Sequence, residues 1–114
     1  MPVRNAEWEV SVAEVKRALE SGAPLLLIDV REPDEHRTCR IDGALLVPLG
    51  ELANRMAELK RLAAGKTVVA HCHHGGRSLS AAATLREAGL AGVKSMAGGI
   101  DEWSMLIDAS VPRY

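Results

Sequence analysis

The stretch of sequence that decides the fold is Thr67-Val68-Val69-Ala70-His71-Cys72-His73-His74-Gly75-Gly76-Arg77-Ser78. Residues 67–70 are apolar or β-branched, which predicts a short buried strand. Two glycines follow, and residues 77–88 then have the composition of a helix that Gly89 ends. A strand joined to a helix by a tight turn is the unit from which parallel α/β sheets are built. This stretch therefore predicts the centre of such a sheet.

The chain on either side repeats the alternation of strands and helices. Ser11 and Glu14 form a capping-box pattern, so a helix is expected over residues 12–20, and Gly22 ends it. The polar segment 31–36, which a proline interrupts, is expected to be a loop or short turn. The order predicts an α/β fold with a mostly parallel central sheet flanked by helices on both faces. Further strands are expected at residues 25–28, 44–47 and 93–96, and further helices at 52–62 and 100–107.

Length and composition restrict the function classes. With 114 residues, 47% of them hydrophobic, residues 1–114 are expected to form a single domain. The formal net charge of −1 argues against nucleic acid as a partner, because nucleic acids select basic surfaces. The aliphatic runs are far shorter than the ~20 residues of a membrane span, and residues 1–5 lack the features of a secretory signal. No membrane partner is expected, and the expected location is cytoplasmic.

Cys72 is the residue on which a catalytic hypothesis rests. It lies directly after the predicted strand, at the carboxyl edge of the sheet, where α/β proteins bind ligands. Gly75 and Gly76 let the backbone turn tightly around the sulfur, so we expect the N–H groups of residues 73–77 and the start of the next helix to form an anion site. Cysteines at helix N-termini have pKa values of about 3.5 to 7.5 instead of about 8.5. Cys72 is therefore expected to be a nucleophile that carries a covalent intermediate.

Four segments resemble, in the same order, those of the single-domain rhodaneses, the thiosulfate-type sulfurtransferases. Residues 72–78 are similar to the CxxGxRS active-site loop of that family. Residues 29–35, which read DVREPDE, resemble its DVREPxE segment. Residues 41–49 resemble its I-x-G-A and P-L segment, and residues 98–103 its closing GGxxxW. The resemblance covers nearly the whole chain and implies the rhodanese-like fold.

The resemblance also implies a sulfur-transfer cycle. Cys72 takes the outer sulfur of a small donor such as thiosulfate as a persulfide and passes it to a thiol, to cyanide or to a protein acceptor. Neither a metal nor an organic cofactor is implied. Asp29 and Arg31 are expected to support the site as an ion pair that holds two loops together. Substrate contacts are expected from His73, His74, Gly75, Gly76, Arg77 and Ser78.

Several charged side chains near the predicted site have alternative roles. Arg77 either meets the donor anion or braces the loop by pairing with Asp29 or Glu32, and the favoured role is a mixed one with more bracing. His71 is expected to end the strand with a hydrogen bond. The histidines at 73–74 are expected to rim the pocket and to add positive charge when protonated.

Other residues are given structural interpretations. Cys39 is expected to be a thiol near the surface, with a role as resolving partner of Cys72 as the alternative. Trp103 is expected to belong to the core. A solvated turn is the interpretation of the acidic cluster Glu32, Asp34 and Glu35.

Two other functions and a metal site are the alternatives to sulfur transfer. A cysteine phosphatase or arsenate reductase on the same scaffold has one more residue between its cysteine and arginine than the four that separate Cys72 from Arg77. A non-catalytic interaction module ranks third, because such modules commonly lose the cysteine or clutter the loop, whereas this chain keeps Cys72 and both glycines. A zinc site is disfavoured because the consecutive residues 71–74 do not converge readily on one tetrahedral centre.

Overall fold

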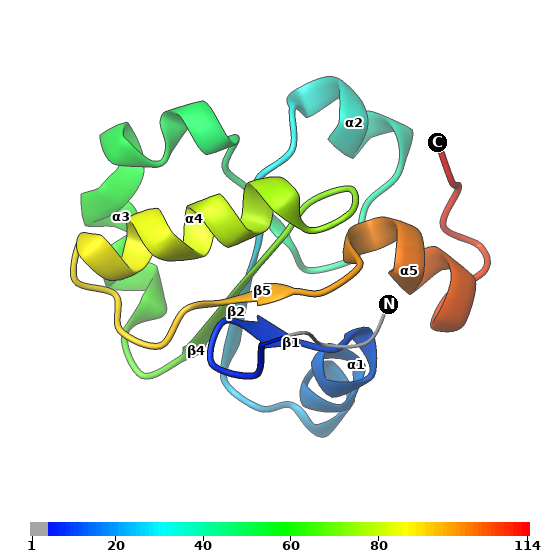
Figure 1. Cartoon of the computed structure of the whole chain (residues 1–114), viewed down its shortest axis with the longest axis horizontal. Coiled ribbons are helices and arrows are strands. Elements are labelled where there is room, and N and C mark those ends of the chain that lie inside the picture. Colours follow the sequence, from blue (N-terminus) through cyan, green and yellow to red (C-terminus); the bar gives the residue numbers. More distant parts are fainter. Residues whose placement is uncertain (1–4) are drawn as a thin grey trace.

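The computed structural model describes residues 5–114, and within them it contains a five-stranded parallel sheet (Figure 1). Neighbouring strands lie in the order β1-β5-β4-β2-β3, and every pair is parallel. This sheet confirms the predicted fold class. Residues 1–4, part of the segment predicted to lack a secretory signal, lie outside the described residues. The strands are β1 (Glu9–Val10), β2 (Leu25–Asp29), β3 (Leu45–Leu46), β4 (Thr67–His71) and β5 (Lys94–Met96).

Helices cover both faces of the sheet, as predicted (Figure 1). One buried cluster lies between the sheet and the helices α3 and α4, and a second lies between the sheet and α1 and α5. Trp103 belongs to the second cluster, which confirms its place in the core. No helix among residues 5–114 is both long enough and apolar enough to cross a membrane. The helices are α1 (Val12–Ser21), α2 (Pro33–Thr38), α3 (Met56–Ala63), α4 (Gly76–Glu87) and α5 (Gly99–Leu106).

Helix α1 has the ends that its sequence predicts. The backbone N–H of Glu14 donates to Oγ of Ser11 over 3.1 Å, and the backbone N–H of Ser11 donates to Oε1 of Glu14 over 3.2 Å. Gly22 ends the helix with a left-handed φ of 70°. Capping side chains and a C-terminal glycine therefore determine where this helix starts and ends.

Three elements differ from the sequence-based expectation. The expected loop at 31–36 contains the six-residue helix α2, because Pro33 stands at the first helical turn, where its missing N–H has no consequence. The helix expected from residue 52 begins only at Met56, after two short 3-10 turns, Leu49–Glu51 and Ala53–Arg55. Strand β1 was not predicted, because two residues are too few to show a period.

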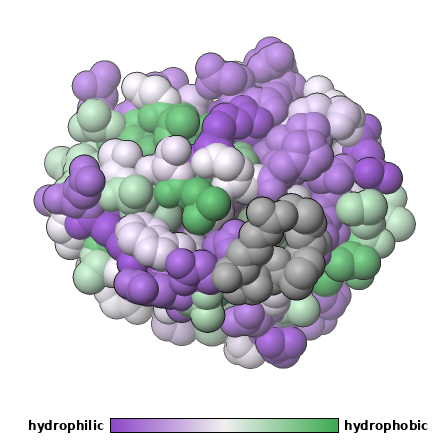
Figure 2. Space-filling model, viewed as in Figure 1, coloured by the Kyte–Doolittle hydropathy of each residue, from purple (hydrophilic) through white to green (hydrophobic). Residues whose placement is uncertain are grey.

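The sheet register brings two loops together at its carboxyl edge. Asp29 at the end of β2 is the direct neighbour of His71 at the end of β4. The segment leading to α2 and the loop leading to α4 therefore start side by side, and Figure 1 shows α2 and the start of α5 on either side of that loop. Figure 2 shows hydrophilic residues gathered over this part of the face. This edge positions the candidate site.

Candidate active site

The sulfur of Cys72 lies inside the loop that follows β4. Its Sγ accepts the backbone N–H of Gly75 over 3.1 Å and that of Ser78 over 3.4 Å, and Oγ of Ser78 is also 3.4 Å away. The residue is only 1% exposed. Both N–H groups are directed at the sulfur, so they can donate to negative charge that develops on it during a reaction. Of the N–H groups of residues 73–77 that were expected to face the sulfur, that of Gly75 donates to it, and the N–H of Ser78, outside that range, is the second donor.

The start of helix α4 has no capping side chain, and the cysteine sulfur takes that place. Gly75 occupies the capping position with a φ of 121°, a conformation that L side chains rarely adopt. The N–H of Ser78, in the first turn, donates to Sγ of Cys72 and not to a capping oxygen. The helix N-terminus therefore directs its partial positive charge at the sulfur.

The start of helix α5 holds the other side of the same loop. The backbone N–H of Ile100 donates to the carbonyl of Cys72 over 2.9 Å, and that of Asp101 donates to the carbonyl of His73 over 3.1 Å. A Cβ on Gly99 would lie 2.4 Å from the His73 carbonyl oxygen, so only glycine permits this approach. The carbonyls thus point to α5, which leaves N–H groups of the loop free to face the sulfur.

Ser78 also connects the loop to the sheet. Its hydroxyl donates to the carbonyl of Gly75 over 3.1 Å and lies 2.6 Å from Oγ of Ser95 on strand β5. Both serine side chains are fully buried. Sequence reasoning missed Ser95, which has no motif around it, and only the strand order β5-β4 brings it beside the loop.

Arg77 braces the loop, but its partner is not one that the sequence suggested. Its two terminal nitrogens lie 2.6 and 2.9 Å from the two carboxylate oxygens of Glu35 on α2, a bidentate pair. The hydrogen bond from Arg77 lowers the pKa of Glu35 to about 2. The expected pairing with Asp29 or Glu32 is wrong, and so is the interpretation of Glu35 as solvated, because its side chain is 18% exposed. Helix α2, expected as a loop, is what presents Glu35 to Arg77.

The predicted ion pair between Asp29 and Arg31 is present and completely buried. Nη2 of Arg31 lies 2.8 Å from one carboxylate oxygen and Nε lies 2.9 Å from the other. Nδ1 of His36 is a third partner of the carboxylate, at 2.9 Å. Burial raises the pKa of Asp29, but the hydrogen bonds from Arg31 and the charges nearby hold it below its ordinary value. Both residues lie in the segment at the end of β2, so the pair braces that segment instead of joining two loops, which was the expectation.

Cys39 is not near the surface, contrary to expectation. It is 5% exposed, and its carbonyl accepts a hydrogen bond of 2.6 Å from Nη2 of Arg31. Both cysteines are free, and they belong to core clusters on opposite faces of the sheet, Cys39 with α1 and α5 and Cys72 with α3 and α4. This separation argues against Cys39 as a resolving partner.

His71 precedes Cys72 and faces the opposite side of the sheet end. It is fully buried, and its main-chain carbonyl accepts the N–H of Val30 over 3.0 Å, which is a hydrogen bond at the strand end as expected. Among the described residues, neither ring nitrogen has a hydrogen-bond partner. Burial lowers the pKa of His71 to about 4. The imidazole is therefore neutral at physiological pH.

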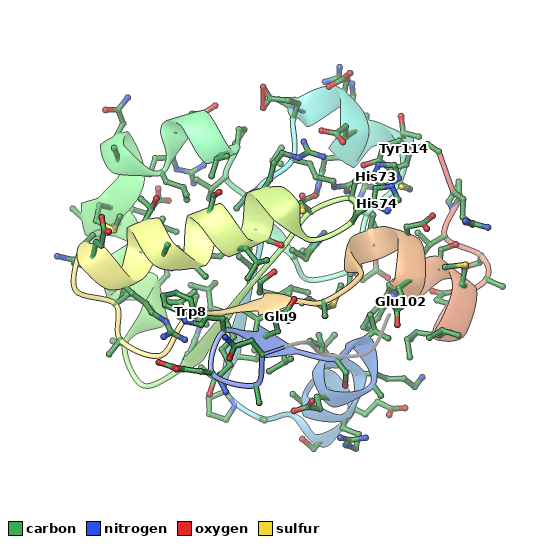
Figure 3. The ribbon with its side chains drawn as sticks, viewed as in Figure 1. Trp8, Glu9, His73, His74, Glu102 and Tyr114 are labelled. Atoms are coloured by element: carbon green, nitrogen blue, oxygen red, sulfur yellow. The ribbon has the colours of Figure 1, made fainter. Side chains whose placement is uncertain are left out.

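The two histidines after Cys72 form a stack with a residue from the end of the chain. The ring of His73 lies 3.9 Å from that of His74 and 3.9 Å from that of Tyr114 (Figure 3). Burial and the neighbouring His74 lower the pKa of His73, which disfavours the protonated form on which its expected positive charge depends. Tyr114 was missed in the sequence, because a single tyrosine far from the motif gives no signal.

No group of three histidine, cysteine or acidic side chains within residues 5–114 is arranged to hold a metal ion. The candidate site thus consists of a sulfur surrounded by N–H groups, a bidentate ion pair and an aromatic stack. Such an arrangement can serve a nucleophile, because peptide dipoles directed at the sulfur can stabilise negative charge there.

Comparison with known proteins gives a consistent family. Residues 11–106 match the family model described as Rhodanese-like domain. The probable adenylyltransferase/sulfurtransferase MoeZ of Mycobacterium tuberculosis is 35% identical over 105 residues, which cover 92% of this chain and 26% of that protein. The chain therefore spans about a quarter of the length of this relative. The putative sulfur carrier protein YrkF of Bacillus subtilis is 32% identical over 84% of this chain and 50% of its own length.

A solved structure matches over nearly its full length. The human single-domain sulfurtransferase TSTD1 is 30% identical, with a TM-score of 0.75, and the match covers 90% of this chain and 98% of that one. The names of these relatives support sulfur transfer as the general class of activity. From the family match and the parallel sheet together, the chain belongs to the rhodanese-like domain family.

Proposed function

We propose that this chain is a sulfurtransferase that carries one sulfur atom on Cys72 as a persulfide. The observation that carries the proposal is the pair of N–H groups, from Gly75 and Ser78, that donate to Sγ of a free cysteine. In a persulfide, the terminal sulfur is bonded to Sγ of Cys72 and carries the negative charge. N–H groups and a helix N-terminus stabilise negative charge, so they favour this group as well. A reducing compartment such as the cytoplasm fits a mechanism that needs a free thiol.

The first half-reaction loads the sulfur. The Cys72 thiolate attacks the outer sulfur of a donor, thiosulfate in the simplest case, and its electron pair forms the new S–S bond. The S–S bond of the donor breaks, and sulfite leaves with the electron pair of this broken bond. Cys72 is now a persulfide anion, and no metal, organic cofactor or external oxidant takes part.

The second half-reaction unloads it. A thiolate or cyanide attacks the outer sulfur of the persulfide. The bond between that sulfur and Sγ breaks, and its electron pair goes to Sγ. The Cys72 thiolate returns to its initial state. The name of the relative YrkF, a putative sulfur carrier protein, supports a protein as one partner in the cycle.

The other residues of the loop act by holding its shape. Arg77 acts as a brace, because its guanidinium is occupied by Glu35. Asp29 and Arg31 hold the segment from which α2 starts. Gly76 and the histidines at 73–74 form the wall that a donor meets.

Three observations favour sulfur over phosphate as the cargo. The loop is one residue shorter than a phosphatase loop, and Cys72 is 1% exposed, so the cup suits a single terminal atom more than a tetrahedral oxyanion. In addition, the arginine that would bind phosphate is already bidentate to Glu35. A non-catalytic module is disfavoured because the sulfur and its N–H donors are all present.

The test is thiocyanate formation from thiosulfate and cyanide. We expect turnover by the natural chain, complete loss in Cys72→Ser, and retention in Cys39→Ala, whose thiol lies on the other face of the sheet. Turnover that survives in Cys72→Ser would overturn the proposal. So would efficient, Cys72-dependent hydrolysis of an aryl phosphate.

A further inference from the structure

Tyr114 connects three parts of the site that are far apart in the sequence. Its hydroxyl donates to Oε2 of Glu35 over 2.7 Å and accepts from Nη1 of Arg31 over 3.0 Å. Its ring is nearly parallel to that of His73, with an interplanar angle of 8° (Figure 3). Tyr114 lies beyond the residues that match the family model, so family membership assigns it no role.

The segment before Tyr114 is anchored well enough to position it. The carbonyl of Val111 accepts a 2.5 Å hydrogen bond from Oγ of Ser104, and the Val111 side chain is buried in the α1 and α5 cluster. Arg113 binds both carboxylate oxygens of Asp101, at 2.9 and 3.3 Å. These contacts hold the tail along α5, so the tyrosine ring is directed onto His73.

The stack disfavours protonation of His73. An imidazolium needs an acceptor for each N–H, and Nε2 of His73 is buried with no hydrogen-bond partner within residues 5–114. Burial is the main cause that lowers the pKa of His73, and the His74 ring lowers it further. The carboxylates of Asp101 and Glu35 and the main chain of Tyr114 act in the opposite direction without cancelling the shift.

The cations around the loop are engaged with carboxylates. Arg77 is paired with Glu35, Arg113 with Asp101 and Arg31 with Asp29. His74 is 66% exposed in its side chain and lies 3.9 Å from Asp101. A donor that approaches Cys72 therefore meets arginines that are already paired and the ring of His73, whose protonation burial disfavours.

We propose that Tyr114 is a positioning residue for donor selection: its ring keeps His73 as a neutral wall beside Cys72, and its hydroxyl keeps Glu35 on Arg77. This inference rests on the proposed sulfur transfer. The chemical consequence is discrimination against small dianions such as thiosulfate, and a relative preference for donors with less charge at the reacting end, such as the persulfide of a thiol. Exposing His73 removes the discrimination, because a protonated imidazole attracts the dianion.

The experiment compares Tyr114→Ala with Tyr114→Phe. Tyr114 is 44% exposed, so neither change empties a core position. We expect Tyr114→Ala to move the NMR titration of His73 up towards its ordinary value of 6.5 and to lower KM for thiosulfate severalfold at pH 6 relative to pH 8, with kcat changed less. Tyr114→Phe keeps the ring and should leave the His73 titration where it is in the natural chain.

A second variant separates this inference from the proposed function. His73→Asn in the Tyr114→Ala background should remove the pH dependence of KM, while loading of sulfur on Cys72, read by mass spectrometry, persists in each tyrosine variant. An unchanged His73 titration in Tyr114→Ala, or equal effects of Ala and Phe, overturns the role of Tyr114 alone. Absence of sulfur on Cys72 in every variant, the natural chain included, overturns the proposed function.

Discussion

The loops that follow β4 and β2 lie side by side but are held by different forces. The loop after β4 is fixed by its main chain, with N–H groups on the sulfur and carbonyls on α5. The segment after β2 is fixed by charged side chains, through the buried ion pair of Asp29 and Arg31 and the ion pair of Glu35 and Arg77. Backbone geometry therefore limits substitutions in the first loop, and unpaired charge limits them in the second. The following substitutions test that difference.

The largest effect is expected where a side chain intrudes into the main-chain loop. Gly99→Ala places a Cβ 2.4 Å from the His73 carbonyl and 2.6 Å from that of Cys72, at a φ of 62°. We expect loss of about 5 kcal/mol or more in unfolding free energy and no measurable sulfur transfer. Gly50→Ala, with open space around its Cβ, is the matched control and should behave as the natural chain in denaturant unfolding. Equal stability of the two variants would contradict the proposed loop geometry.

The next effect is expected from breaking the buried pair. Arg31→Met leaves the Asp29 carboxylate buried without its main partner, which destabilises proteins by about 3–5 kcal/mol. Urea unfolding measures the change. Adding Asp29→Asn should restore part of the loss, because the remaining buried charge is then removed. In Lys16→Met, the control, an exposed pair is lost and the change should stay below about 1 kcal/mol. A small effect of Arg31→Met would show that charge does not hold this segment.

His71, on the other side of the sheet end from Cys72, should produce a pH dependence of stability. Its pKa is about 4 when folded and near 6.5 when unfolded, so between these values only the unfolded chain binds the extra proton. Stability is therefore lost as the pH falls from 6.5 towards 4, by roughly 3 kcal/mol at most. Unfolding in urea at pH 7 and pH 5 measures the slope. His71→Leu should flatten it, and His74→Gln should preserve it; a slope unchanged in His71→Leu would contradict the assignment.

The smallest effect is expected at the partly exposed ion pair of Glu35 and Arg77, here called the clamp. Glu35→Gln removes the charge that faces Arg77, whose side chain is 37% exposed, so we expect a loss of about 1 kcal/mol and a less than tenfold drop in kcat/KM at pH 7. Because the pKa of Glu35 is lowered to about 2, the clamp in the natural chain stabilises above pH 4.5 and is lost as the pH falls through 2. Glu58→Gln, in a surface pair, should leave activity unchanged. Full activity and stability in Glu35→Gln would show that this ion pair does not hold the loop.

The sequence predicted the parts of the molecule that local rules determine. The capping box of α1, the strand before Cys72 and the glycines around it follow from the conformational preferences of single residues. The pair of Asp29 and Arg31 was also predictable, because two residues of separation place both groups at the end of one strand.

The parts that sequence reasoning missed depend on contacts between distant residues. Glu35 meets Arg77 across 42 positions, and α2, which presents it, looked like a polar loop because its helical signal is a proline and a few acidic residues. Ser95 and Tyr114 reach the site only through strand order and through the path of the tail along α5. Cys39 was misplaced because nothing beside it in the sequence indicates that Arg31 lies against it.

The most direct measurement is the mass of the protein after mixing with thiosulfate under non-reducing conditions. The account predicts an increase by one sulfur atom, located by digestion on the peptide that contains Cys72, and no increase in Cys72→Ala. An unchanged mass of the natural chain with both thiosulfate and a thiol persulfide as donors, or added sulfur that persists in Cys72→Ala, would contradict it.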